Sequence, residues 1–284
     1  MREALRDGIR TLEASETPSA PLAAELLLMH VLGKDRSWLY AHPEEVLSST
    51  QLGKYSELLA LRASGAPTQY LTGTQEFWGL DFEVTRDVLI PRPETEHVIE
   101  VALARIGEAQ RGTELKIADI GTGSGCIAVA LAHELPRARI YATDISRGAL
   151  EVARRNAARN GVAERVHFCE SNLLSGVAEP VEFDVIVSNP PYVAERDAES
   201  LPRDVREHEP RIALFAGEAG LDVYAPLIVQ AETRLRRGGI LVLELGFGMF
   251  EAVSDMLDSA RGWSCVSATM DLAGIPRVLS ATKS

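Results

Sequence analysis

The fold of this 284-residue chain is decided by one stretch, Ile117-Ala118-Asp119-Ile120-Gly121-Thr122-Gly123-Ser124-Gly125. Its largely apolar first part predicts a buried strand, and the glycines predict a tight turn that leads into a helix. The spacing is Gly-x-Gly-x-Gly, which differs from the Gly-x-Gly-x-x-Gly of dinucleotide binders, and no Lys-Ser/Thr follows as in a P-loop. By itself, this pattern is compatible with a ligand loop or with a purely structural turn.

Helical and extended patterns alternate from about Glu94 to the end of the chain. Strands are expected at 115–120, 139–143, 165–169, 183–188 and 240–245, and two more near 265–269 and 278–281. Helices are expected at 95–106, 124–135, 146–160, 221–236 and 250–258. Such alternation predicts an α/β fold with a doubly wound, mostly parallel sheet of seven strands, covered by helices on both faces.

The first seventy or so residues have a different pattern of apolar residues, which predicts short helices. These are expected around the apolar face of 5–12 and at 21–33, 44–47 and 55–61. We therefore expect a small all-helical domain at 1–75, a hairpin and linker at 76–92 and the sheet domain at 93–284. The linker is indicated by alternating residues around Gly79 and by Ile90-Pro91-Arg92-Pro93, which cannot continue a strand interior.

Two further features point to a site at the carboxyl edge of this sheet. Asp144 closes the strand at 139–143, where an acid can bridge both hydroxyls of a ribose. The alternative for Asp144 is that it supports the dipole of the helix at 146–160. Asn189-Pro190-Pro191-Tyr192 follows the strand at 183–188 and offers an amide, a main-chain carbonyl and a phenol ring, which suit a planar NH2 group.

The structural alternative for residues 189–192 is a rigid turn whose asparagine bonds locally. In a doubly wound sheet, however, the first and fourth strands are neighbours, and ligands bind in the crevice at their carboxyl ends. The glycine loop follows the first strand and Asn189 follows the fourth. The two motifs are therefore predicted to face one crevice.

Composition excludes several classes of protein. The formal net charge is −12 with no Lys/Arg-rich stretch, which disfavours binding to nucleic acid. The three cysteines, Cys126, Cys169 and Cys265, are far apart, so neither a disulfide framework nor a metal site is expected. No apolar run is long enough to span a bilayer, and the first residues carry charges where a signal peptide needs an apolar core. A cytoplasmic protein with no membrane partner is expected.

These residues also resemble a known family. The segment 119–125 and Asp144 resemble the first two signature segments of class I S-adenosylmethionine-dependent methyltransferases, and 189–192 is similar to the motif shared by glutamine and adenine-N6 methyltransferases. The wider chain resembles the protein-(glutamine-N5) methyltransferases that modify peptide chain release factors. That resemblance is carried by Arg62 to Gly73, Glu76 to Leu80, Leu89 to Glu96, Glu209 to Leu214 and Gly220 to Asp222.

The resemblance implies S-adenosyl-L-methionine as cofactor, a release factor as protein substrate and no nucleic-acid partner. It implies roles for specific residues. The cofactor's methionine and ribose side should be lined by Gly121, Thr122, Gly123, Ser124 and Gly125; its ribose hydroxyls should be held by Asp144; its adenine should lie near Asn172 and Leu173; and the substrate glutamine should be held by Asn189, Pro190, Pro191 and Tyr192. Asn189 should touch the cofactor as well. One departure is that the family commonly has an acid and an aromatic residue where this chain has Asn172-Leu173.

The expected reaction is methyl transfer to a glutamine side-chain nitrogen, with Asn189, Pro190 and Tyr192 as catalytic residues. The Asn189 side-chain carbonyl and the Pro190 main-chain carbonyl would accept the two amide hydrogens, and Tyr192 would pack against the amide plane. The helical domain would help to dock the release factor. Two alternatives are adenine-N6 methylation of nucleic acid, against which the net charge argues, and a non-catalytic cofactor-binding interaction protein, which the intact 189–192 motif disfavours.

Overall fold

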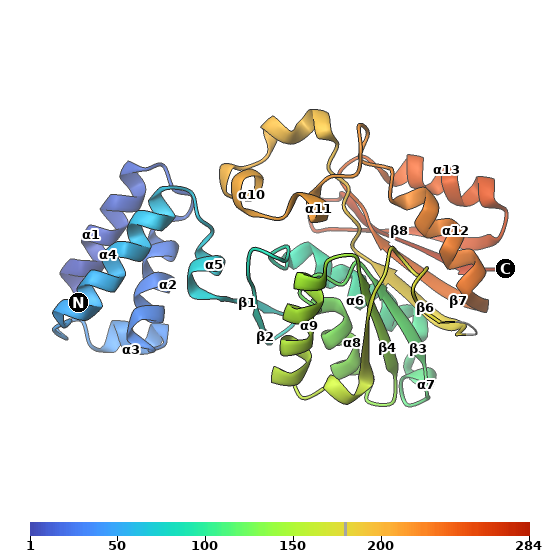
Figure 1. Ribbon diagram of the computed structural model, residues 1–284, viewed down its shortest axis with the longest axis horizontal. Helices are drawn as coiled ribbons and strands as arrows, with labels where there is room; N and C mark the ends of the chain where they lie inside the picture. The colour runs from blue at the N-terminus through green and yellow to red at the C-terminus, as the bar shows by residue number, and fades with distance from the viewer. Residues whose placement is uncertain (179–180) are drawn as a thin grey trace. The chain divides into compact units, whose positions relative to one another are not determined.

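The computed structural model describes residues 1–178 and 181–284 (Figure 1). These residues form two compact units. One unit comprises Met1–Thr74 together with Leu201–His208, and the other comprises Gln75–Ser200 together with Glu209–Ser284. The segment Leu201–His208, which follows the 189–192 motif along the chain, thus belongs with the amino-terminal helices.

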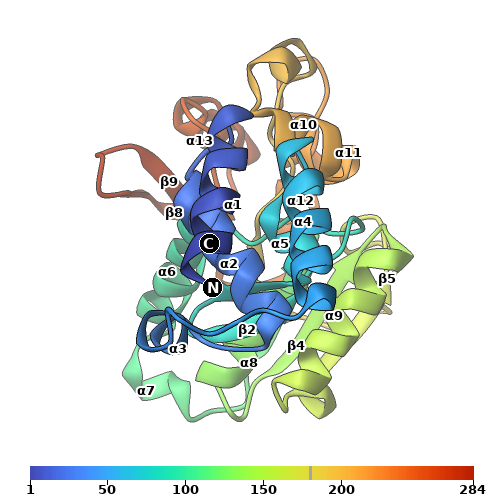
Figure 2. The same ribbon diagram turned by 90° about the vertical axis from the view of Figure 1, so that its left-hand side faces the viewer.

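The amino-terminal unit is helical, as expected. Its helices are α1 (Arg2–Ala14), α2 (Ala20–Leu32), α3 (Arg36–Ala41), α4 (Ser49–Ala63), α5 (Thr68–Thr72) and α10 (Arg203–His208). Helices α1, α2 and α4 pack side by side (Figure 2) around fully buried leucines, among them Leu12, Leu27 and Leu28. Helix α2 begins with a proline in its first turn and ends at Gly33, whose φ of +61° closes the helix in the left-handed conformation.

Two expectations for this unit were wrong. Residues 44–47 are not helical; the helix lies earlier, at α3, because the Asp35 carboxylate caps it by accepting from the Trp38 amide at 2.7 Å. Residues 203–208, for which no helix was expected, form α10. Arg62, only 6% exposed, reaches Asp204 in α10 at 3.4 Å, and this partly buried pair gives the short helix an anchor.

The second unit begins with the expected hairpin, β1 (Thr74–Phe77) and β2 (Leu80–Glu83), and contains a seven-stranded sheet in the order β5-β4-β3-β6-β7-β9-β8. The strands are β3 (Lys116–Ile120), β4 (Arg139–Asp144), β5 (Val166–Glu170), β6 (Phe183–Ser188), β7 (Leu235–Glu244), β8 (Trp263–Met270) and β9 (Pro276–Lys283). Strand β9 runs antiparallel to both of its neighbours, β7 and β8, and the pairs from β5 to β7 are parallel. The predicted fold class is confirmed.

Helices cover both faces of this sheet (Figure 1). The helices of this unit are α6 (Glu96–Ile106), α7 (Glu108–Arg111), α8 (Cys126–Glu134), α9 (Arg147–Arg159), α11 (Arg211–Leu214), α12 (Tyr224–Arg234) and α13 (Phe250–Ala260), with 3-10 turns at η1 (Pro93–Thr95), η2 (Ala163–Arg165) and η3 (Glu195–Ser200). Side chains of β6 alternate between the faces: Val185 and Val187 share a core with α6 and α8, whereas Ile186 shares one with α12 and α13. Both cores are therefore built on the same central strands.

One boundary in this unit was predicted wrongly. The helix expected to reach residue 236 ends at Arg234, and β7 begins at Leu235, well before the expected Ile240. Phe183 pairs with Leu235 and Val185 with Ile240, so β7 carries extra residues in a bulge. Gly238, with a φ of +75°, permits that bulge. The pair Gly238-Gly239, which is typical of a helix end, is instead part of an irregular strand.

The arrangement that positions the site is the pairing of β3 with β6. Ile120 at the end of β3 lies opposite Ser188 at the end of β6. The glycine loop and Asn189 therefore leave the sheet side by side, as the strand order of a doubly wound sheet predicts.

Candidate active site

A cavity of about 280 Å³ opens at the carboxyl ends of β3, β4 and β6. It brings together most of the residues that the sequence singled out. Those lining it are Gly121, Thr122, Gly123, Ser124, Asp144, Asn172, Leu173, Asn189, Pro190 and Pro191. Gly125 and Tyr192 are not among the residues that line the cavity.

The three glycines of the loop all have positive φ, but they serve two purposes. Gly121 (φ +71°) and Gly123 (φ +55°) face open space, because a Cβ atom built on either would meet no atom within 4 Å. A Cβ on Gly125 (φ +80°) would lie only 3.0 Å from the Ala153 Cβ. Gly121 and Gly123 thus leave bare backbone toward the cavity, whereas Gly125 lets α9 approach the loop.

Two aspartates hold the glycine loop in place. Asp119, fully buried, accepts hydrogen bonds through Oδ2 from the Thr122 hydroxyl at 2.6 Å and from the Ala128 amide at 3.1 Å. Burial raises its pKa to about 7, against the lowering effect of these bonds. Asp144 accepts from the Gly123 amide at 2.9 Å and from the Ser146 amide at 2.8 Å, and burial raises its pKa as well.

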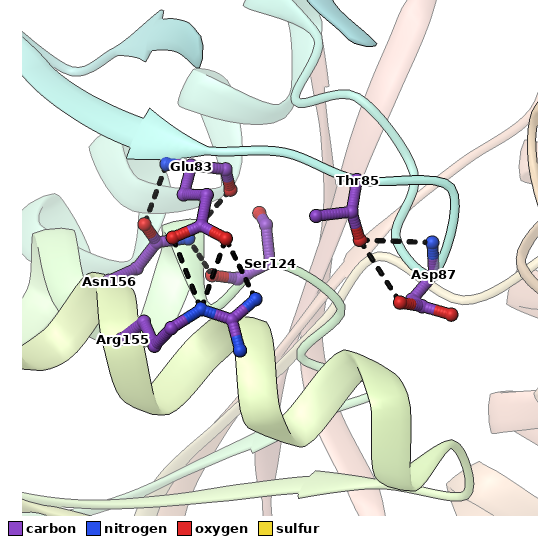
Figure 3. Close-up of polar contacts among 6 residues, drawn as sticks. All are labelled: Glu83, Thr85, Asp87, Ser124, Arg155 and Asn156. Atoms are coloured by element: carbon purple, nitrogen blue, oxygen red, sulfur yellow. Dashed lines mark hydrogen bonds and ion pairs between the residues drawn. The ribbon is translucent and has the colours of Figure 1, made fainter. Parts of the chain in front are cut away.

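A clamp on α9 joins the hairpin to the same loop (Figure 3). The Asn156 side chain accepts from the Glu83 amide at 2.7 Å and donates to the Glu83 and Ser124 carbonyls, each at 2.9 Å. Beside it, Arg155 binds the Glu83 carboxylate with both Nε and Nη2. The fully buried Asn156 thereby links β2, α9 and a residue that lines the cavity.

The 189–192 motif is held from both ends. Just before it, the Ser188 hydroxyl donates to the Ile120 carbonyl at 2.7 Å, tying the two strand ends together. Asn189 Nδ2 donates to Thr95 Oγ1 at 3.0 Å. At the other end, the Tyr192 hydroxyl donates to Glu244 Oε1 at 3.3 Å. The Tyr192 ring packs against Gly246, where a Cβ atom would lie 2.9 Å from ring carbon Cδ2.

Glu244 connects this motif to the end of β7. Its side chain is buried, and burial raises its pKa to about 7, while the hydroxyl groups of Thr95 and Tyr192 lower it. Burial and the Glu244 charge also raise the pKa of Tyr192. The phenol therefore stays protonated and can donate only to an acceptor such as this carboxylate.

Several residues of the site were missed from the sequence. Ile145 lines the cavity directly after Asp144 and is 53% exposed, and its place next to a strand-end acid was a usable signal. Thr95 also lines the cavity, and Glu244 ends an apolar strand. Arg92 lines the cavity and pairs with Glu209, which is 5% exposed and accepts from the Ile90 amide at 3.3 Å. These partners are distant in sequence, so only the fold brings them together.

Comparisons with known proteins point in one direction. Residues 3–73 match the model of the PrmC N-terminal domain, and residues 102–204 match that of the methyltransferase small domain. A release factor glutamine methyltransferase from Koribacter versatilis is 44% identical over 283 residues, which cover 100% of this chain and 98% of that protein. One from Moorella thermoacetica is 43% identical over 281 residues, covering 99% and 98%. The chain belongs to the release factor glutamine methyltransferase family.

A solved methyltransferase from Pyrococcus furiosus supports the fold. It has a TM-score of 0.53 and 22% identity and covers 72% of this chain and 89% of its own. As a release factor glutamine methyltransferase, the chain is an enzyme that uses S-adenosyl-L-methionine. In the described ranges 1–178 and 181–284, no helix is long and apolar enough to cross a bilayer. Over the same ranges, no group of three or more histidine, cysteine or acidic side chains is arranged to hold a metal ion.

Proposed function

We propose that this chain transfers the methyl group of S-adenosyl-L-methionine to the N5 side-chain nitrogen of a glutamine in a peptide chain release factor. The observation that carries the proposal is that the glycine loop, Asp144 and Asn189-Pro190-Pro191 all line one cavity. The loop and acid proposed to bind the nucleoside therefore line the same cavity as the turn proposed to bind the amide. Family membership supports the same reaction.

The residues of the cavity fit the cofactor. Gly121 and Gly123 present bare backbone that a Cβ atom would otherwise cover. Each Asp144 oxygen accepts one backbone hydrogen bond and retains lone pairs for a ribose hydroxyl. The adenine would lie near Ile145, Asn172 and Leu173, and Gly125 contributes by packing the loop on α9. The cofactor supplies an activated methyl group on a positively charged sulfur.

The chain's own contribution is to position a weak nucleophile. An amide nitrogen is a poor nucleophile because its lone pair is delocalised into the carbonyl. Asn189 Oδ1 and the Pro190 main-chain carbonyl would accept its two hydrogens and orient that lone pair. Alignment of two reactants can contribute about 7–11 kcal/mol. The fixed φ of Pro190 holds its carbonyl in place, and Tyr192, bonded to Glu244, supports the turn. Packing of the Tyr192 ring on the amide plane remains a prediction.

The test is to incubate the protein with methyl-labelled S-adenosyl-L-methionine and either a release factor or an adenine-containing oligonucleotide. We expect label on a glutamine of the release factor. Label on the oligonucleotide alone would refute the proposal, and label on neither, with normal cofactor binding, would favour a non-catalytic binding protein. In this assay Asn189→Ala should abolish turnover while cofactor affinity falls only modestly; unchanged turnover would refute the carbonyl-acceptor mechanism.

The proposal extends to partner and location. The helical unit, which matches the PrmC N-terminal domain, would help to dock the release factor. A net charge of −12 makes nucleic acid an unfavourable direct partner. An enzyme that modifies a translation factor would act in the cytoplasm.

A further inference from the structure

We propose that Thr95 and Glu244 are positioning residues that turn the Asn189 carboxamide so that its oxygen, and not its nitrogen, faces the substrate amide. The proposal rests on the proposed function, since it concerns how the acceptor for the substrate hydrogens is set. Thr95 lies in the turn η1 before α6, and Glu244 ends β7. Neither belongs to the glycine loop or to the 189–192 motif.

The difficulty that these residues resolve is the near symmetry of an asparagine side chain. Its oxygen and nitrogen occupy almost the same volume, but only the oxygen can accept a hydrogen from a substrate amide. If the group were reversed, two NH2 groups would face each other. Asn189 Nδ2 donates to Thr95 Oγ1 at 3.0 Å, so the nitrogen is engaged on the side of α6. The carbonyl oxygen is then the end left for the cavity.

Thr95 alone cannot fix this orientation, because a hydroxyl group both donates and accepts. A neighbouring group that only accepts removes the ambiguity. The Glu244 carboxylate is such a group when it is ionised. Its buried Oε2 has no hydrogen-bond partner among the described residues and is free to attract the proton of the Thr95 hydroxyl, whose influence lowers the pKa of Glu244. With the Thr95 proton directed toward Glu244, the lone pairs of Thr95 face Asn189. The register supports this, because Leu243 pairs with Ser188 and places Glu244 level with Asn189.

The chain of contacts is shielded from water, which would otherwise offer both donors and acceptors. Thr95 and Glu244 are each 2% exposed. Glu244 also accepts a hydrogen bond from the Tyr192 hydroxyl at 3.3 Å, so the same carboxylate holds the Tyr192 end of the 189–192 motif, while Thr95 bonds the Asn189 end. Charged and titratable neighbours come from every element around it: Glu94 from η1, Arg277 from β9, and Tyr224 from α12, whose hydroxyl donates to the Glu244 main-chain carbonyl at 2.8 Å.

The first experiment removes the Thr95 hydroxyl at constant volume. Thr95→Val should lower kcat about 100-fold with little change in cofactor Kd, because a misoriented acceptor impairs chemistry more than binding. Thr95→Ser, which restores the hydroxyl, should recover most of the rate. Ser280→Ala is the matched control: it removes another buried hydroxyl, on β9, which is bonded to Ser267 at 3.0 Å and lies outside the cavity. It should leave kcat unchanged.

The second experiment reverses the direction of hydrogen bonding between Thr95 and Glu244. Glu244→Gln can donate to Thr95, which would direct the Thr95 proton toward Asn189 and favour the reversed carboxamide. Its kcat should fall by a similar factor, and the double variant with Thr95→Val should be no worse than either single variant, because both act through Asn189. The fall in wild-type kcat as Glu244 takes up a proton should be missing from Glu244→Gln. Wild-type kcat in either single variant would overturn the proposal.

A third measurement separates this proposal from the proposed function. In the protein without cofactor or substrate, the Asn189 side-chain NH2 should exchange slowly with solvent in NMR spectra and should lose that protection in Thr95→Val. Protection unchanged by Thr95→Val would refute the positioning role. If the NMR result holds but the wild-type enzyme labels no release factor, the positioning of Asn189 stands and the substrate assignment fails.

Discussion

At the scale of single residues, Gly123 combines a left-handed backbone conformation with an open place in the cavity. Its φ is +55°, and a Cβ atom would meet nothing within 4 Å. Gly123→Ala should therefore cost about 1–2 kcal/mol of folding stability, because L residues disfavour this conformation. The added methyl would also occupy space in the cavity that we propose for the cofactor, and we expect cofactor affinity to fall at least about tenfold, equivalent to about 1.4 kcal/mol. Urea unfolding and calorimetric titration measure the two effects.

Gly161 provides the control for this prediction. It follows α9 with a φ of +69°, is exposed and likewise has nothing within 4 Å of a built Cβ, but it does not line the cavity. Gly161→Ala should lose similar stability and keep the wild-type cofactor affinity. Equal loss of affinity in both variants would show that backbone strain, and not the methyl group in the cavity, governs binding.

At the scale of elements, the contact between β2 and α9 allows two adjacent side chains to be compared. Fully buried Asn156 makes three hydrogen bonds to backbone groups, whereas the partly exposed Arg155 makes an ion pair with Glu83 (Figure 3). Asn156→Ala strands buried polar groups and should cost about 1–3 kcal/mol or more. Arg155→Ala should cost at most about 1 kcal/mol. Denaturant unfolding of both variants tests the ranking, and a larger loss in Arg155→Ala would contradict it.

The sequence could predict the elements that depend on local patterns, and it missed those that depend on distant partners. The strand at 183–188 was predicted residue for residue, because a largely apolar run that ends at Asn189-Pro190-Pro191 has few other interpretations. The neighbouring positions of the glycine loop and Asn189 followed from the strand order of a doubly wound sheet. Helix α10 and the bulge in β7 were missed, because both depend on partners elsewhere in the fold, such as Arg62 for Asp204. Thr95 was missed for the same reason, being 94 positions from Asn189.

At the scale of the whole molecule, the stability of the fold should depend on pH in two opposite ways. The buried acids Asp119 and Glu244 differ in this respect from Glu83 and Asp271. Salt bridges and hydrogen bonds lower the pKa values of Glu83 and Asp271, so their stabilising contribution is present above their ordinary pKa range and is lost as pH falls below it. Asp119 and Glu244 behave in the opposite way, because burial raises the pKa of each to about 7. Asp119 and Glu244, which support the site, should therefore stabilise the folded protein less as pH rises.

The sign of that effect can be tested on the protein without cofactor. The ordinary pKa values of Asp119 and Glu244 are 3.8 and 4.5, so between these values and about 7 the folded state keeps protons that the unfolded chain releases. Their contribution to the free energy of unfolding is largest below pH 4 and declines as pH rises to about 7. Melting temperatures measured from pH 5 to 7.5 should therefore fall more steeply for the wild type than for Asp119→Asn or Glu244→Gln, whose amides do not titrate. Parallel curves for wild type and variants would mean that neither acid holds its proton in the folded protein.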